Sequence, residues 1–506
     1  MPPGSSPDSS SPGVAGGRDF AVSGILKPDD VQGLLPPGLR AEPERRTKLR
    51  RVWLDTVDGR LAKRGFALVH VSDGAKRQLV LDTEPRSLVA ATGDELPRWP
   101  VDLPAPVAVR VSALMGLRAL IPMRTVETSA VVLRVLDDEE KTIGRLWLER
   151  SPRGGAQTAR VDHLRGYERQ ADRVAKALSR DPRLSPISPP KAGTAPGPRR
   201  PALTRDLAAT HAVGLVLGHL FDVIEANVEG TSAAIDTEFL HDLRVAVRRT
   251  RSALKLTADV LPARFVARFA GRARWLGDLT TPARDLDVML LELPAMQAAL
   301  PDGTGADLEP LRELLSERVA NEYVALGKGL HSARIRQFAS SYRSELATIA
   351  ASPARAPLAG EAADRWAAAA LQRVLKRGAR ITPASPPESL HDLRKRCKEL
   401  RYCLELFEPL WDARDLGQVV DELKSLQDNL GMFQDSEVQS EMLRHWADEL
   451  ATTRNAPTAT AIAIGRLTVH LEASQHAARA EFAERFNRFG RPANRARFAA
   501  LTGGVR

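Results

Sequence analysis

Cysteine is almost absent from this 506-residue chain, which has only Cys397 and Cys403. Two cysteines six positions apart in a charged segment cannot form a disulfide framework or a four-ligand metal site, so both kinds of stabilised small domain are excluded. The sequence also has no run of 18 or more apolar residues, and its first residues lack an apolar signal core. We therefore expect a cytoplasmic protein that does not use a membrane as its partner.

Aromatic residues make up only 5% of the chain, which argues against proteins that stack single-stranded bases on aromatic side chains. Acidic residues are outnumbered: 63 Asp and Glu stand against 73 Lys and Arg, for a formal net charge of +10. This excess favours an anionic partner, and at this level nucleic acid, an anionic surface and a phosphate polymer all fit. The 43% of hydrophobic residues excludes wholesale disorder.

Composition changes along the chain predict two folded domains. Residues 1–17 are rich in Pro, Ser and Gly and are expected to be disordered. Residues 18–180 contain short runs of Val, Leu, Ile and Trp bounded by Gly, Pro or Asp, which are typical of an antiparallel sheet or barrel. Residues 181–202 hold seven prolines and predict a semi-rigid linker. From residue 203 to about residue 500 the apolar spacing is helical.

The individual elements can also be predicted. Strands are expected at Val52–Thr56, Phe66–Ser72, Gln78–Asp82, Val107–Ser112, Thr128–Leu136 and Thr142–Glu149, and a closing helix is expected at Val161–Leu178. In the second domain, the helices are expected to be interrupted at Pro262, Pro282, Pro301, Pro353 and Pro383 to Pro387.

One five-residue phrase occurs twice in the helical domain. Leu240–Arg244 reads Leu-His-Asp-Leu-Arg, and Leu390–Arg394 repeats it 150 residues later. This period is close to the size of a small helical bundle, so two related bundles are expected at about 203–350 and 360–500. The predicted fold class is α+β: an antiparallel β-barrel or tunnel-like domain, followed by an all-α domain of two pseudo-symmetric four-helix bundles.

Both copies continue with basic side chains at offsets 3, 7 and 10 from the histidine, which places them on one helical face. These cations are Arg244, Arg248 and Arg251 in the first copy and Arg394, Lys398 and Arg401 in the second. Like charges one turn apart repel each other by roughly a few tenths of a kcal/mol, so such a face favours a bound anion. A solvated surface face is the alternative, and the repetition argues against it.

Other residues could extend this basic surface. His241 and His391 are in phase with the cations and could donate to phosphate oxygens, although a helix cap is the alternative. The further cations are Arg274, Arg284 and Lys424, each of which could equally pair with a neighbouring acid.

The segments Leu240–Leu256, Arg272–Leu290, Leu390–Phe407 and Leu423–Val438 resemble the CHAD family in order and spacing. The resemblance implies a helical domain that binds inorganic polyphosphate in a basic channel, with polyphosphate granules as an expected location. The implied polyphosphate-binding residues are His241, Arg244, Arg248, Arg251, Lys255, Arg274, Arg284, His391, Arg394, Lys395, Lys398, Arg401 and Lys424. Binding of nucleic acid by the same faces stays open, because electrostatics alone does not separate the two polyanions.

The first domain, through Arg51–Thr56, Asp58 and Arg60–Leu68, resembles the CYTH family of triphosphate tunnel enzymes. These enzymes need a Glu-x-Glu-x-Lys strand that holds divalent metal against a triphosphate. The candidate strand, Phe20–Gly24, contains no acid. We therefore expect no catalytic residue and no cofactor, with a divalent metal only if this domain is active. A metal-dependent triphosphatase is the competing hypothesis.

Overall fold

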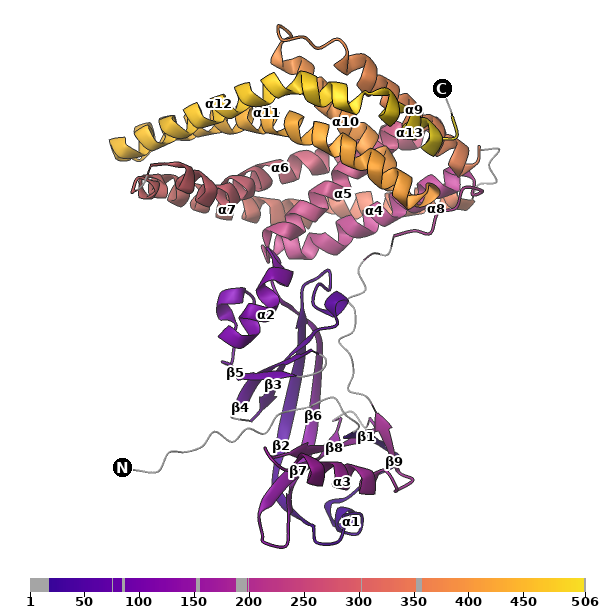
Figure 1. The fold of residues 1–506 in the computed structure, drawn as a ribbon, viewed down its shortest axis with the longest axis vertical. Coiled ribbons are helices and arrows are strands. Elements are labelled where there is room, and N and C mark those ends of the chain that lie inside the picture. The colour runs from indigo at the N-terminus through magenta and orange to yellow at the C-terminus, as the bar shows by residue number, and fades with distance from the viewer. Residues whose placement is uncertain are drawn as a thin grey trace. The chain divides into compact units, whose positions relative to one another are not determined.

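The computed structural model describes residues 18–74, 76–83, 87–151, 155–187, 198, 200–301, 303–351 and 357–504. Contacts divide the chain into two compact units, Met1–Gly197 and Pro198–Arg506, which we call the β unit and the helical unit (Figure 1). The segment expected to be disordered, 1–17, lies outside the described residues, as do residues 188–197 and 199 of the predicted linker. The α+β class is confirmed: an antiparallel sheet domain is followed by a helical domain.

The β unit is built on one nine-stranded antiparallel sheet with the order β5-β4-β3-β2-β6-β7-β8-β1-β9. Its strands are β1 Asp19–Val22, β2 Arg40–Asp55, β3 Ala67–Asp73, β4 Lys76–Asp82, β5 Leu88–Ala91, β6 Ile121–Leu136, β7 Thr142–Arg150, β8 Gln157–His163 and β9 Leu184–Ile187. The long strands β2 and β6, of 16 residues each, pair at its centre. Among the described residues, the order ends at β5 and β9, so the sheet is open and not a closed barrel.

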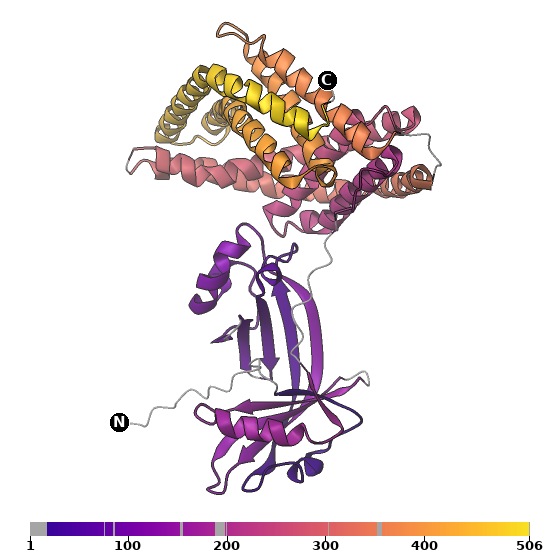
Figure 2. The ribbon, with the colours of Figure 1, turned by 45° about the vertical axis from the view of Figure 1, so that its right-hand side comes forward.

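Short helices cover one face of this sheet (Figure 2). They are α1 Pro28–Gln32, η1 Ala62–Arg64, η2 Pro100–Asp102, α2 Ala105–Met115 and α3 Glu168–Leu178. One core packs α2 against β2, β3 and β4, and a second core packs α3 against β1, β6, β7 and β8. The opposite face of the sheet is therefore left to line a cavity, described below.

The strand expected at Val107–Ser112 is wrong, because this segment lies in helix α2. Valines at every second position imitate a strand, but only Val107, Val111 and Met115 are buried, four residues apart on one helical face. Val109 between them is 82% exposed. Packing against the sheet thus selects the secondary structure of this segment, because its local sequence pattern fits both a strand and a helix.

The predicted helix Val161–Leu178 is correct only in its second half. Val161 pairs with Leu146 within the sheet, so β8 extends to His163, and α3 begins at Glu168. Gly166 separates the two elements with a φ of 91°, a conformation that disfavours other residues. Strand β9, Leu184–Ile187, also lies inside the predicted linker, where it pairs with β1 at the edge of the sheet.

The helical unit consists of long helices in two copies of one arrangement (Figure 1). Its elements are α4 Ala209–Ser232, α5 Thr237–Leu256, α6 Ala263–Ala299, η3 Gly305–Leu308, α7 Glu309–Leu330, α8 Ala333–Ala351, α9 Ala359–Gly378, α10 Pro387–Leu406, η4 Glu408–Leu410, α11 Ala413–Thr453, α12 Thr458–Phe489 and α13 Pro492–Leu501. Helices α4, α5 and α6 begin 150 residues before α9, α10 and α11, as comparison of residues 209 with 359, 237 with 387 and 263 with 413 shows. An antiparallel bridge between Ala208 and Leu358 joins the copies at equivalent positions.

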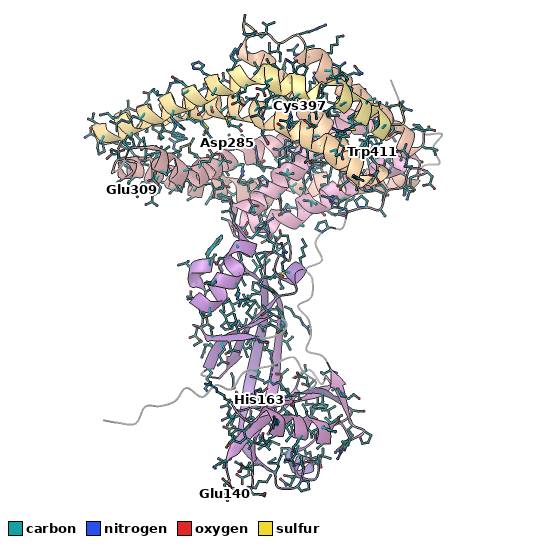
Figure 3. All side chains as sticks on the ribbon, in the orientation of Figure 1. Glu140, His163, Asp285, Glu309, Cys397 and Trp411 are labelled. Carbon is teal, nitrogen blue, oxygen red and sulfur yellow. The ribbon has the colours of Figure 1, made fainter. Side chains whose placement is uncertain are left out.

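The core of the helical unit spans both copies. Helix α4 is long and apolar enough to cross a membrane by length and composition, but its residues Val216, Leu220 and Ile224 are buried in this core. Cys397, labelled in Figure 3, is fully buried on the core side of α10, as its apolar stripe predicts. Burial raises the pKa of its thiol to about 12, so it stays protonated.

The interruption expected at Pro282 is wrong, because α6 continues through it from Ala263 to Ala299. Proline lacks an N–H and normally weakens the preceding helical turn. Here the Gly277 carbonyl in that turn accepts hydrogen bonds from the Arg244 guanidinium at 3.2 Å and the Thr281 hydroxyl at 2.9 Å. Side chains thus stabilise the turn before the proline. The interruption expected at Pro353 lies outside the described residues.

Candidate anion-binding site

The two helices that carry the repeated phrase, α5 and α10, lie against each other in antiparallel directions. Lys255 forms an ion pair with Glu399 at 2.5 Å, and Arg249 forms one with Glu405 at 2.5 Å. The Arg248 guanidinium lies 5.8 Å from the centre of the Tyr402 ring. The internal repeat therefore brings the basic faces of its two copies together.

A cavity of about 530 Å³ lies where these faces meet α11. Its lining is mainly polar and comes from both copies of the repeat. The lining residues are His241, Val245, Arg248, Arg249, Arg394, Lys398, Arg401, Tyr402, Glu405, Gln427, Asp428, Gly431, Met432 and Asp435. Five of the predicted binding residues are among them: His241, Arg248, Arg394, Lys398 and Arg401.

Two cations in this cavity lack acidic partners. Among the described residues, Arg248 and Lys398 form no ion pair, although every other cation of the lining has an acidic neighbour within 4.0 Å. Burial, followed by repulsion from Arg394 and Arg248, lowers the pKa of Lys398 to about 8. The charged form of Lys398 is therefore destabilised in the free protein, and a bound anion would stabilise it.

The other two predicted cations of the cavity share their charge with acids. Arg394 contacts Asp435 at 2.9 Å, and Arg401 contacts Glu405 at 2.5 Å. Asp435 is exposed at the cavity wall and lies on α11, where an incoming anion could compete with it. A phosphate oxygen could replace the carboxylate as the partner of these cations, because the ion pairs lie at the cavity wall and not in the core.

The two repeated histidines occupy different environments. Nη2 of Arg284 donates to Nδ1 of His241 at 3.1 Å, and burial together with the Arg284 charge lowers the pKa of His241. His241 is therefore a neutral acceptor in the free protein. Nε2 of His391 instead lies 2.7 Å from the Glu437 carboxylate, outside the cavity lining. Nη1 of Arg284 is buried without a hydrogen-bond partner in the described part of the chain, so one more donor is available beside His241.

The structure places Arg244 away from the cavity. Its guanidinium donates to Gly277, Thr280 and Thr281 of α6, at 3.2, 3.0 and 2.9 Å. Burial lowers its pKa, and the nearby Asp285 carboxylate, labelled in Figure 3, opposes that shift. Arg244 therefore links α5 to α6. Its spacing from His241 alone does not distinguish this structural role from a binding role.

The remaining predicted cations lie outside the lining. Lys255 and Lys395 are paired with acids, and Arg251, Arg274 and Lys424 are exposed on α5, α6 and α11. The sequence analysis missed nine lining residues, among them three acids and one aromatic residue. They are Val245, Arg249, Tyr402, Glu405, Gln427, Asp428, Gly431, Met432 and Asp435. Those on α11 fall in the segment that resembles the family, where only cations were considered.

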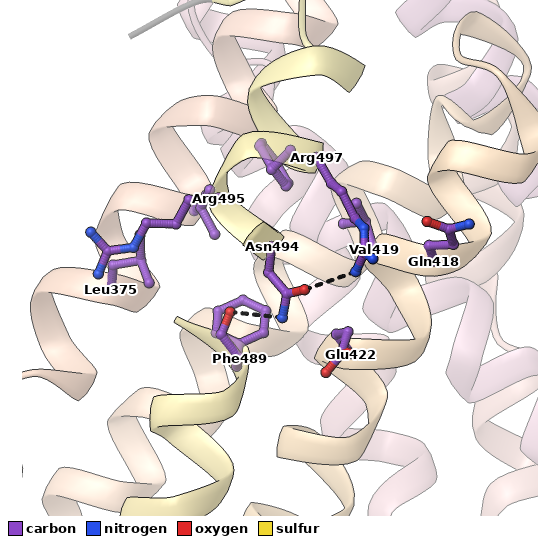
Figure 4. A pocket seen from close by; sticks show the side chains of 10 residues that line it. Leu375, Gln418, Val419, Glu422, Phe489, Asn494, Arg495 and Arg497 are labelled. Carbon is purple, nitrogen blue, oxygen red and sulfur yellow. Dashed lines mark hydrogen bonds between the residues drawn. The ribbon is translucent and has the colours of Figure 1, made fainter. Parts of the chain in front are cut away.

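A smaller cavity lies near the C-terminal helix α13 (Figure 4). Its volume of about 20 Å³ suits a water molecule, and Leu375 and Phe489 line it. Asn494 of the lining is already engaged: its Nδ2 donates to the Phe489 carbonyl at 3.2 Å, and its Oδ1 accepts from Arg497 at 3.1 Å. We interpret this space as a packing gap.

The acids of the β unit do not form a metal site among the described residues. The candidate strand of the sequence analysis overlaps β1, whose acid is Asp19. Glu149 accepts two hydrogen bonds from Arg51, at 2.6 and 2.7 Å. Burial alone would raise the pKa of Glu149, but the Arg51 hydrogen bonds and the Arg160 charge lower it to about 2.

Fold and site together define a helical domain of two repeats with a cationic cavity at their junction. Residues 215–444 match the family model of the CHAD domain, so the helical unit contains a CHAD domain, as the repeated motif predicts. The family is associated with polyphosphate binding. The β unit lies outside the matched residues.

Two solved structures are similar to this chain. The crystal structure of the CHAD domain from the plant Ricinus communis is 24% identical, with a TM-score of 0.45, and the match covers 61% of this chain and 96% of that chain. PptA from Streptomyces chartreusis is 17% identical, with a TM-score of 0.44, and the match covers 56% of this chain and 100% of that one. No curated protein matches the chain.

Proposed function

We propose that the protein binds inorganic polyphosphate in the cavity between α5, α10 and α11. The observation that carries this proposal is the convergence of two unpaired cations, Arg248 and Lys398, from the two copies of the repeat. The CHAD domain supports it, because its family is associated with this ligand. Location at polyphosphate granules in the cytoplasm follows from the same ligand.

A phosphate polymer suits the cavity chemically. Each unit of the chain carries about one negative charge, and guanidinium and ammonium groups bind phosphate oxygens without reading a base. Tyr402 is the aromatic residue of the lining, and Arg248 already lies over its ring. A nucleic acid would therefore find phosphate-binding groups here but no free stacking surface.

Titration of the full-length protein with long-chain polyphosphate tests the proposal. We expect saturable binding, which duplex DNA competes for only weakly, with no release of free phosphate when magnesium is present. The same titration with tripolyphosphate checks the competing triphosphatase hypothesis through its phosphate signal. Absence of polyphosphate binding, or equal competition by DNA, would contradict the proposal.

The low pKa of Lys398 predicts a pH dependence of binding. In the free protein the pKa is about 8, and a bound polyanion raises it by removing the repulsion that depresses it. Affinity is therefore fully present below about pH 8 and falls as the pH rises through and above this value, by at most about tenfold per pH unit. The measurement is the Kd between about pH 7 and about pH 9.

Lys398→Arg provides the matched control, because arginine stays charged throughout this range. We expect the variant to bind with a Kd that changes little with pH. The same decline in wild type and variant would show that another group titrates.

A further inference from the structure

The β unit contains a cavity of about 340 Å³ on the sheet face that α2 and α3 leave uncovered. It is lined from eight strands, so the sheet must curve strongly around it. The lining residues are Asp19, Arg51, Trp53, Ala67, Val69, Val71, Val80, Asp82, Arg124, Val126, Thr128, Glu149, Ser151, Ala156, Thr158, Arg160 and Ile187. None of them belongs to the helical unit.

One wall of this cavity is apolar. On β2, Val52 and Leu54 pack into the core beneath α2, whereas Trp53 points to the other face and into the cavity. Valines of β3, β4 and β6 extend this wall next to Trp53: Val69, Val71, Val80 and Val126. Apolar surface that faces an open cavity is stabilised when a ligand covers it, because water is then displaced.

Two arginines and two acids beside this wall neutralise each other. Arg51 binds Glu149 with two hydrogen bonds, and Arg160 lies 3.7 Å from Glu149 and 3.2 Å from Asp162. Arg160 is 8% exposed and Glu149 5%, so these charges are held in place by their pairing. With both acids ionised the four groups carry no net charge; burial raises the pKa of Asp162, and the Arg160 charge opposes that shift.

Asp19 adds one negative charge to this balanced group. It lies on β1 directly opposite Arg160 in the register, and its carboxylate accepts no hydrogen bond among the described residues. Burial raises its pKa to about 6, so at neutral pH it is mainly ionised although it is poorly solvated. A donor with a positive charge would satisfy it.

The other cation of the lining does not offset Asp19. Arg124 is exposed, and its guanidinium lies 5.1 Å from the centre of the Trp53 ring. Solvent screens its charge, whereas the charge of Asp19 acts in a partly buried site. The cavity as a whole thus combines an apolar wall with two acids outside the ion-paired group: Asp82 accepts a hydrogen bond from the Ser87 hydroxyl at 3.0 Å, and Asp19 accepts none in the described part of the chain.

We propose that this cavity binds a small, largely apolar molecule with one protonated amine, whose ammonium group pairs with Asp19 and whose apolar body covers the valine wall. This site is separate from the proposed polyphosphate cavity. A triphosphate has the opposite charge. Arg51 and Arg160 are already paired with Glu149 and Asp162, which leaves the exposed Arg124 as the remaining arginine of the lining.

Phenethylamine is a suitable probe, and its binding to the full-length protein can be followed by calorimetry and ligand-observed NMR. We expect Asp19→Asn to weaken phenethylamine binding at least tenfold and to leave binding of neutral phenethyl alcohol unchanged. Asp29→Asn, which removes an exposed acid on α1, is the matched control and should bind like the wild type. Failure of phenethylamine to bind, or equal binding by Asp19→Asn, would overturn the proposal.

A second variant tests the apolar wall without touching the charge. Val126→Phe narrows the cavity and should weaken both phenethylamine and phenethyl alcohol, with helical content and melting temperature as controls for folding. Stronger binding of hydrocinnamate than of phenethylamine, lost in Arg124→Gln, would overturn the proposal in favour of an anion. Displacement of phenethylamine by tripolyphosphate would overturn it in the same way.

Discussion

Replacement of both Arg248 and Lys398 by glutamate is expected to abolish polyphosphate binding while the helical unit stays folded. Charge-assisted hydrogen bonds contribute roughly 1.5–3 kcal/mol each, so loss of both costs about 3–6 kcal/mol, on the order of a hundredfold to ten-thousandfold in Kd. Neither side chain forms an ion pair in the described structure, so their replacement leaves no buried acid unpaired. The Kd for long-chain polyphosphate and the circular dichroism spectrum measure the two effects.

The matched control changes the same amount of charge elsewhere on the helical unit. Lys328 on α7 and Arg466 on α12 are exposed and outside the cavity lining, so Lys328→Glu with Arg466→Glu should change the Kd only slightly. Similar losses in both double variants would attribute binding to the net charge of +10 and not to the cavity. A folded Arg248→Glu, Lys398→Glu protein with wild-type affinity would exclude this cavity as the site.

The repeat could be found in the sequence because its information is local. The steps of 3, 4 and 3 from the histidine through the three basic residues depend only on helical geometry. They place Arg248, Lys398 and Arg401 in one cavity, whereas Arg251 lies outside its lining. The same 150-residue period relates the first residues of α4, α5 and α6 to those of α9, α10 and α11. The fold class and the meeting of the two basic faces at one cavity were therefore predictable.

Arg244 shows what the local pattern could not contain. It has the same offset from its histidine as Arg394, yet one contacts the α6 backbone near Pro282 and the other contacts Asp435 beside the cavity. The difference arises from residues more than thirty positions away on α6 and α11, which no helical periodicity of α5 or α10 records. The same holds for the acids of the cavity, because their effect depends on which cations they reach.

Segment Val107–Ser112 illustrates the corresponding limit for secondary structure. Its alternating valines satisfy a strand pattern, while Val107, Val111 and Met115 satisfy a helical one. The sheet surface beneath α2 selects the helix, because it buries all three side chains together. Where a sequence pattern fits both a strand and a helix, the surface against which the segment packs determines which of the two forms.

The salt dependence of polyphosphate binding is the second large effect that the cavity predicts. Four charged cations line it besides Arg249: Arg248, Arg394, Lys398 and Arg401. For a flexible polyanion, the logarithm of the binding constant falls with the logarithm of salt with a slope of about −0.7 per cation engaged, so four cations give about −2.8. Between 50 and 200 mM salt the affinity should fall on the order of 50-fold.

Single neutral variants turn this slope into a count of the cations that contact the polymer. Arg248→Gln should reduce the slope by about 0.7, whereas Arg274→Gln, which alters an exposed residue outside the lining, should leave it unchanged. Binding constants measured at several salt concentrations for the three proteins give the slopes. An equal reduction in Arg274→Gln would show that the contact surface extends along α6. A slope near zero in the wild type would contradict binding through cations, because neutralising a polyphosphate chain necessarily releases counterions.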